Sequence, residues 1–149
     1  PTAMGVLEAA AATGRDGADV FTIGGRRVRM WIDERTDDAG VGDIDRARSV
    51  AAARGRFARN ALIQGAAAEF FKVWAVTVRA RGRALDGRVV LCLHDELIVH
   101  VPEAHGDAMA AVLVEALGEA AYRWAPRRDG PAVRFVADVS VIHRWSEAK

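Results

Sequence analysis

Three consecutive polar residues interrupt an otherwise apolar segment in the second half of the chain. His94-Asp95-Glu96 follows Val89-Val90-Leu91-Cys92-Leu93 and precedes Leu97-Ile98-Val99. An ionised carboxylate left unpaired among apolar residues is very costly, so two adjacent acids require metal ions, hydrogen-bond donors or solvent. We therefore expect a β-hairpin over residues 88–101, ended by Pro102, whose turn carries both carboxylates to a sheet edge facing a cation or a phosphate.

The overall charge excludes a strong basic field, but the charges are unevenly distributed. The 149 residues are enough for one domain with a substantial core, and the net charge is +1. Residues 33–45 hold six acids and one base, whereas residues 46–59 hold five arginines and no acid. A local basic face is therefore compatible with a total near zero.

The single cysteine, Cys92, excludes an internal disulfide and fits a reducing, cytoplasmic setting. Its apolar neighbours favour a buried structural thiol over a nucleophile. No apolar stretch approaches the roughly 18 residues of a membrane span and no signal peptide is visible, so no membrane partner is expected. The chain begins at Pro1, which fits either trimming or a piece of a longer protein.

The N-terminal part predicts a helix and a hairpin. Residues 2–13 are Ala-rich, and Gly14 is the expected stop of a helix there. Residues 20–23 and 26–31 predict two short strands joined through Gly24-Gly25. The alternative interpretation of this glycine pair and the arginines after it, a phosphate-binding loop, is less favoured than a hairpin turn.

Long helices dominate the rest of the predicted fold. The acidic residues 33–42 predict a solvated loop, with Asp43 as the N-cap of a helix over residues 44–81, which is either one long helix or two abutting ones. Residues 104–124 predict an amphipathic helix and residues 133–142 a final strand. The apolar face of the amphipathic helix is formed by Met109, Val112, Leu113, Ala116, Leu117 and Ala120. The fold class is therefore α+β, with a small antiparallel sheet packed against the two longer helices.

A stripe of polar side chains is expected on the long helix. Arg56, Asn60 and Gln64 follow an i, i+4, i+8 spacing that places them along one face, with Arg59 close by. The stripe is either an ordinary solvated face or a contact to the minor groove of a duplex, where every base pair offers acceptors in similar places. The small residues 65–68 that follow predict close packing of the helix against a sheet.

Three interpretations of the His94-Asp95-Glu96 turn remain open from the residues alone. Its acids either pair with nearby arginines, serve as the acid and base of a hydrolase, or form a site for Mg²⁺, which is bound by one or two carboxylates together with substrate phosphates. The other histidines, His100, His105 and His143, lack a third ligand at suitable spacing and are interpreted as strand or surface residues.

Taken together, these segments resemble the C-terminal part of the family A DNA polymerases, the bacterial DNA polymerase I group. Residues 56–69 are similar to the family pattern R-x-x-x-N-x-x-x-Q-G-[TA]-A-A-[DE], and residues 91–97 are similar to its palm motif C, an apolar strand followed by H-D-E. Residues 22–27 are similar to the T-x-x-G-R-R hairpin with Gly25 inserted or shifted, and residues 136–145 to the closing strand and terminal Trp. The Arg/Ala-rich composition resembles that of the actinobacterial branch of the family, the bifunctional exonuclease/polymerases.

The resemblance implies a polymerase palm-type sheet and specific residue roles. Asp95 would be a ligand of the catalytic Mg²⁺ ions, Glu96 an accessory acid, and His94 a neighbour of the primer terminus. Arg56, Asn60, Gln64 and Arg59 would contact primer-template DNA in the minor groove. The implied partners are primer-template DNA and a deoxynucleoside triphosphate.

Other parts of the family pattern are not found in these 149 residues. Motif A with its second metal-binding aspartate, the fingers helix R-x-x-x-K-x-x-x-[FY]-G and the thumb are missing, so residues 1–149 would be a partial palm with an incomplete two-metal site. We expect that the chain alone does not polymerise and needs the missing segments or a partner chain. The alternative is a free-standing, non-catalytic palm remnant that acts as a DNA-binding or interaction module.

Overall fold

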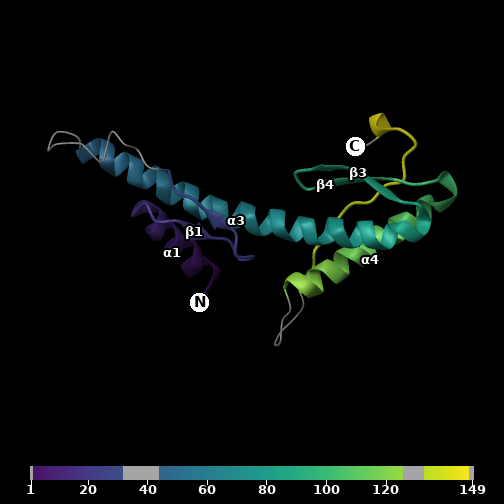
Figure 1. Ribbon diagram of the computed structural model, residues 1–149, viewed down its shortest axis with the longest axis horizontal. Coiled ribbons are helices and arrows are strands. Elements are labelled where there is room, and N and C mark those ends of the chain that lie inside the picture. Colours follow the sequence, from purple (N-terminus) through teal and green to yellow (C-terminus); the bar gives the residue numbers. More distant parts are fainter. Residues whose placement is uncertain (1, 32–43, 126–132, 148–149) are drawn as a thin grey trace. The chain divides into compact units, whose positions relative to one another are not determined.

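The computed structural model describes residues 2–31, 44–125 and 133–147 of the chain, which forms two compact units (Figure 1). The first unit covers Pro1–Ala67 and the second Ala68–Lys149. Helix α3 (Ile44–Gly82) contributes residues to both units. The acidic loop at 33–42 and the expected N-cap Asp43 lie outside the described residues.

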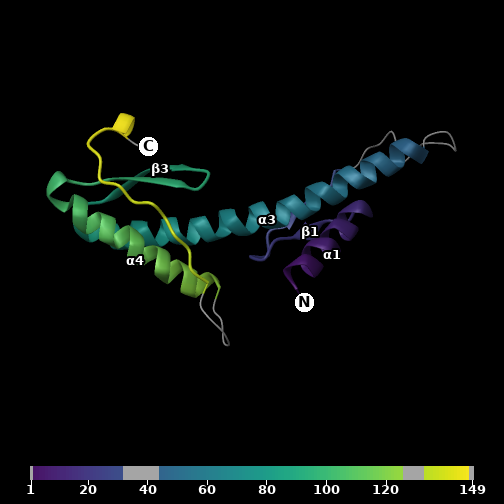
Figure 2. The same ribbon diagram turned by 180° about the vertical axis from the view of Figure 1, so that it is seen from behind.

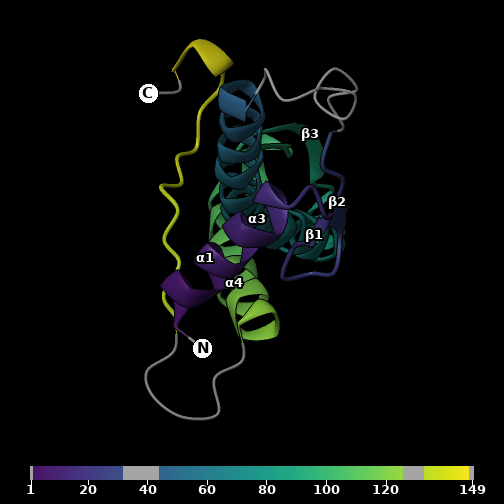
Figure 3. The same cartoon turned by 90° about the vertical axis from the view of Figure 1, so that its left-hand side faces the viewer.

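The first unit begins with helix α1 (Ala3–Arg15), which Thr2 caps by accepting a hydrogen bond from the Gly5 amide at 3.2 Å. The expectation that Gly14 stops this helix is wrong, because Gly14 lies inside it and is buried. A Cβ at Gly14 would lie 2.5 Å from the Cβ of Ala58, so the glycine allows α1 to approach α3 closely (Figure 3).

A short hairpin completes the first unit. Strands β1 (Val20–Phe21) and β2 (Arg27–Val28) pair antiparallel and are shorter than predicted, while the turn at Gly24-Gly25 is confirmed. Gly25 has a φ of 85°, which a residue with a side chain rarely adopts. The core of this unit consists of Ala10, Val20, Met30, Ala58 and Leu62, with Leu7 and Val28 packed against it.

Helix α3 is continuous from Ile44 to Gly82, which decides between the one-helix and two-helix predictions. Its interior glycines serve close packing. A Cβ at Gly55 would lie 3.0 Å from the carbonyl oxygen of Ala11, and one at Gly65 would collide with the side chain of Thr22 in the hairpin. The predicted close packing of the small-residue run is therefore confirmed at Gly65.

The second unit contains the hairpin that the sequence predicts around His94. The 3-10 turn η1 (Arg83–Leu85) ends α3 and leads through Asp86 into β3 (Arg88–Leu93), which pairs antiparallel with β4 (Glu96–His100). Val89 pairs with Val99 and Leu91 pairs with Ile98, so a β-bulge leaves one extra residue on β3 between them.

Helix α4 (Gly106–Trp124), which follows the 3-10 turn η2 (Glu103–His105), runs alongside the C-terminal part of α3 (Figure 2). Trp74 and Val78 of α3 are buried against the apolar face of α4, and Leu97 and Val99 of the hairpin pack on the same cluster. The buried members from α4 are Met109, Ala116, Leu117 and Ala120, with Val112 and Leu113 partly buried. The predicted apolar face and the α+β packing are confirmed.

The final strand predicted over residues 133–142 is wrong as a strand. No ladder pairs these residues within the described part of the chain, which ends in the 3-10 turn η3 (Trp145–Glu147). Phe135 instead stacks on Phe70 with ring centroids 3.9 Å apart. The alternating sequence pattern corresponds to an extended segment in which Phe135, Ala137 and Val139 are half-buried on one side. Alternation of this kind does not by itself supply a partner strand for the backbone hydrogen bonds.

The expectation that nothing approaches a membrane span is wrong for α3. Within Ile44–Leu85 an 18-residue window with a mean hydropathy of 1.3 meets the length and composition of a span, and 28% of it is buried. Core helices of soluble domains have the same length and composition, and Trp74 and Val78 of α3 pack against α4. Length and composition alone therefore do not assign a span.

Candidate functional site

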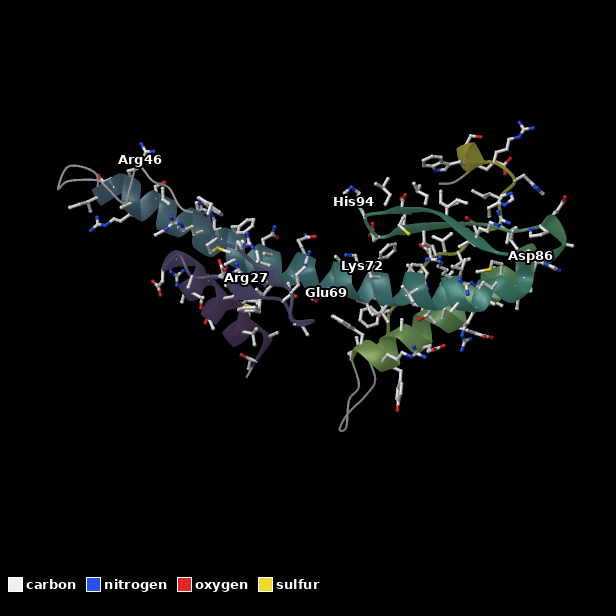
Figure 4. All side chains as sticks on the ribbon, viewed as in Figure 1. Arg27, Arg46, Glu69, Lys72, Asp86 and His94 are labelled. Atoms are coloured by element: carbon white, nitrogen blue, oxygen red, sulfur yellow. The ribbon has the colours of Figure 1, made fainter. Side chains whose placement is uncertain are left out.

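The polar turn lies at the free end of the β3–β4 hairpin, where His94 is labelled in Figure 4. Leu93 pairs with Glu96, so the loop consists of His94 and Asp95 alone. His94 has a φ of 52°, a left-handed conformation that is uncommon outside glycine but is enriched in His, Asn and Asp. This tight turn fixes Asp95 at the tip and Glu96 as the first residue of β4.

His94, Asp95 and Glu96 are all exposed, so water rather than the core solvates the two carboxylates. Within the described residues no hydrogen bond or ion pair involves the side chain of Asp95 or Glu96. The interpretation in which these acids pair with nearby arginines therefore finds no support there. The acids remain available to an external cation or donor.

The side chains of the turn meet only part of what a divalent metal ion needs. Among the described residues no group of three or more His, Cys, Asp and Glu side chains is arranged to hold a metal. Zinc sites normally use three or four protein ligands, whereas Mg²⁺ keeps several waters and is held by one or two carboxylates plus phosphates. The turn fits one side of a magnesium site and does not fit a zinc site.

The polar stripe on α3 lies in the first unit and is exposed along its length. Arg56, Asn60 and Gln64 are exposed, as is Arg59 at the flank. The opposite side of the helix packs into the unit through Gly55, Ala58, Leu62 and Gly65. The guanidinium and the two amides therefore present donors to solvent from a helix that is held firmly on its other face.

Cys92 is exposed, so the expectation of a buried thiol is wrong. Its neighbour Val90 is 59% exposed on the same strand, whereas Val89 and Leu91 are partly buried. The apolar run of β3 therefore reflects a sheet with one covered side. The error arose because a continuous apolar run predicts burial on both sides.

The remaining histidines lie apart from the turn. Nδ1 of His105 is 3.1 Å from the carbonyl oxygen of Leu85, which ties η2 to the end of α3, and this makes His105 a structural residue. His100 pairs with Arg88 in the hairpin ladder, and the side chain of His143 is exposed. The interpretation as strand and surface residues agrees with the positions of His100 and His143, whereas it is wrong for His105, which lies partly buried in the 3-10 turn.

One contact near the stripe was not predicted from the sequence. Trp31, which follows the hairpin, lies edge to face against Phe57 of α3, with ring centroids 5.2 Å apart and an interplanar angle of 77°. Both rings remain exposed. The sequence offered one hint of this contact, because the aromatic Phe57 directly follows Arg56 of the stripe. It did not identify the partner ring, which lies 26 residues earlier in the chain.

Comparison with known families decides the class of the chain. The model of DNA polymerase family A matches residues 6–147. The chain belongs to this family. Both the resemblance seen in the motifs and the α+β fold class are therefore confirmed.

Individual relatives agree with the family assignment. The segment is 31% identical to the thermostable DNA polymerase I of Thermus thermophilus over 138 residues, which cover 83% of this chain and 16% of the relative. It is 40% identical to DNA polymerase theta of Caenorhabditis elegans over 50 residues, 34% of this chain and 3% of the relative. The 149 residues thus span about a sixth of the length of the Thermus polymerase.

A solved structure has a similar fold over most of the chain. The polymerase domain of Pol1 from M. smegmatis, in complex with DNA primer-template and dNTP, superimposes with a TM-score of 0.59 at 29% sequence identity. The match covers 78% of this family A segment and 19% of that chain.

Proposed function

We propose that this family A segment is part of a template-directed DNA polymerase and forms part of its palm. It would contribute Asp95 as a ligand of the catalytic metal ions and the α3 stripe as a contact to primer-template DNA. The observation that carries the proposal is the two-residue turn, which presents Asp95, exposed and unpaired among the described residues, at the tip of an apolar hairpin.

The carboxylates have distinct positions and therefore distinct roles. Asp95 at the tip would bind Mg²⁺ through its oxygens, and Glu96 at the base of the turn would act as an accessory acid. Bound divalent ions would stabilise the charge that develops on the attacking and leaving oxygens. The left-handed backbone of His94 forms part of the two-residue turn, and its side chain would lie near the primer terminus.

The stripe supports the DNA part of the proposal through its chemistry. Arg56, Asn60 and Gln64 present donors along one exposed helix face, and the minor groove offers acceptors at every base pair in similar places. Such contacts test the shape of a base pair and position the duplex without selecting a sequence. Arg59, on the flank, would contribute charge toward phosphates.

The reaction proposed for the complete enzyme is attack of a primer 3′-hydroxyl on the α-phosphorus of a deoxynucleoside triphosphate, with pyrophosphate as the leaving group. Positioning and electrostatic stabilisation would supply most of the catalysis. The second metal-binding acid and the nucleotide-binding fingers helix would come from residues outside these 149. We further propose a cytoplasmic location for the complete enzyme.

Primer extension tests this proposal. The 149-residue chain is assayed alone and then together with a purified segment of the same polymerase that carries motif A and the fingers helix, in the presence of Mg²⁺. We expect no extension by the chain alone and extension by the mixture. Extension by the chain alone would contradict the incomplete metal site.

The alternative, a free-standing palm remnant, predicts a different outcome of the same assay. A remnant would bind primer-template DNA in an electrophoretic mobility shift but would give no extension with the added segment. The Asp95→Ala variant separates the two further, since within a complete polymerase it should abolish extension and leave DNA binding unchanged. The matched control is Asp138→Ala, which removes an exposed acid of the extended C-terminal segment.

A further inference from the structure

Two aromatic rings of the first unit lie beside the polar stripe without belonging to the core. Trp31 is 43% exposed and Phe57 is 42% exposed, although the two rings contact each other. Neither residue is among those that form or line the core cluster of this unit. Aromatic side chains left in contact with water in this way carry a large apolar area that a ligand can cover.

Helix geometry places Phe57 at the border of the stripe. Successive residues of an α-helix are about 100° apart around its axis, so Phe57 lies about 20° from Gln64 and about 60° from Asn60. Phe57 also directly follows Arg56 in the chain. The aromatic pair and the polar stripe therefore form one continuous exposed surface on α3.

The charges around this surface indicate the kind of ligand. Residues 46–67, which make up nearly all of α3 within the first unit, contain five arginines and no acid. Arg56 and Arg59, on either side of Phe57 in the sequence, are both exposed. A basic surface that also carries exposed aromatic rings is typical of sites for single-stranded nucleic acid, where bases stack on the rings and arginines follow the backbone.

We infer that Trp31 and Phe57 form a stacking platform for an unpaired nucleotide next to the duplex that the stripe contacts. This inference rests on the proposed function, because it assumes that the stripe binds primer-template DNA. The platform adds a contact that is indifferent to base identity, since every base has a face that stacks. It would hold the unpaired template strand in line with the paired part.

Fluorescence anisotropy with two labelled DNAs tests the platform. One DNA is a primer-template with an unpaired 5′ template extension, and the other is a blunt duplex with the same paired length. In the 149-residue chain, Trp31→Ala and Phe57→Ala should weaken binding of the extended DNA by at least about fivefold and leave binding of the blunt duplex within about twofold. Trp31→Phe keeps a ring and should bind the extended DNA nearly as well as the unmodified chain.

The outcomes separate the platform from the proposed function. Equal affinities of the unmodified chain and the alanine variants for the extended DNA would overturn the platform alone. An equal loss on both DNAs would also overturn it, because the rings would then only position the stripe. Failure of the unmodified chain to bind either DNA would overturn the platform and the proposed function together.

A second measurement keeps the test decisive if an alanine variant fails to fold. The extended DNA should quench tryptophan fluorescence of the unmodified chain, and this quenching should be largely lost in Trp31→Phe, which retains the fold and the other tryptophans. Quenching that persists at the same level in Trp31→Phe would overturn the platform. The matched control, Trp145→Phe in the second unit, should retain the quenching.

Discussion

Trp74 joins the two helices that support the hairpin, and its truncation should strongly lower the free energy of unfolding. The residue is 7% exposed, its Nε1 donates a hydrogen bond to the carbonyl oxygen of Leu113 at 3.0 Å, and its ring lies 5.8 Å from that of Phe71. Truncating a buried Trp or Phe to Ala costs about 3–5 kcal/mol, from lost transfer free energy and the residual cavity. We expect Trp74→Ala to lower the free energy of unfolding of the second unit by this amount.

Urea unfolding followed by far-UV circular dichroism measures the effect. With a slope of about 2 kcal/mol per molar urea, Trp74→Ala should lower the midpoint of the second unit by about 2 M. Trp74→Phe keeps most of the volume and loses the hydrogen bond, so it should cost about 1–2 kcal/mol. The matched control is Trp145→Ala, whose side chain is 63% exposed and which should change stability by less than about 0.5 kcal/mol. Equal midpoints for the Trp74→Ala and Trp145→Ala variants would refute the packing argument.

Three further predictions concern the glycines, the ion pairs and the stripe. Gly65→Ala should destabilise the first unit because a Cβ there collides with Thr22, whereas Gly118→Ala meets open space and should stabilise α4 by about 0.5–1 kcal/mol. Thermal melts of both variants measure these changes, and equal shifts in melting temperature would count against the close packing. Arg81→Met removes ion pairs to Glu115 at 3.0 Å and Glu119 at 2.7 Å, but the Arg81 side chain is 42% exposed. Chemical denaturation should therefore show a loss of unfolding free energy below about 1 kcal/mol, and this loss should shrink with added salt. A larger or salt-independent loss would contradict this. Arg59→Gln should weaken binding of all duplexes alike and reduce the slope of log affinity against log salt by about 1, and an unchanged slope would exclude a phosphate contact.

The elements with strong local signals were predictable from the sequence. The periodic apolar positions from Met109 to Ala120 gave the buried face of α4, and the acids between two apolar runs gave the β3–β4 turn. These predictions succeeded because one face of a helix or the end of a hairpin is encoded within a few residues.

The errors have a common physical cause. Whether residues 133–142 form a strand depends on a pairing partner that is distant in sequence. Whether the thiol of Cys92 is buried depends on distant residues that would cover it. A pairing strand and a covering layer are tertiary features, and local composition cannot supply either. Gly14 failed as a helix stop for a related reason, since its role is to let α1 approach Ala58.

Some features of the candidate site were likewise predictable from the sequence, and others were not. The turn residues and the spacing of the stripe could be found in the sequence because each group is contiguous or helical. The contact between Trp31 and Phe57 could not, because it depends on how the residues after the first hairpin pack on α3.

The central claim is that Asp95 is a metal-binding acid of a DNA polymerase. The most direct measurement is single-turnover primer extension by the complete enzyme at saturating primer-template and nucleotide, with Asp95→Asn compared with Asp138→Asn. We predict a fall in rate of at least about 100-fold for Asp95→Asn, as expected when stabilisation of several kcal/mol is lost, with unchanged DNA affinity. For Asp138→Asn we predict a rate close to that of the unmodified enzyme. A normal rate for Asp95→Asn would contradict the role of Asp95 as a metal ligand.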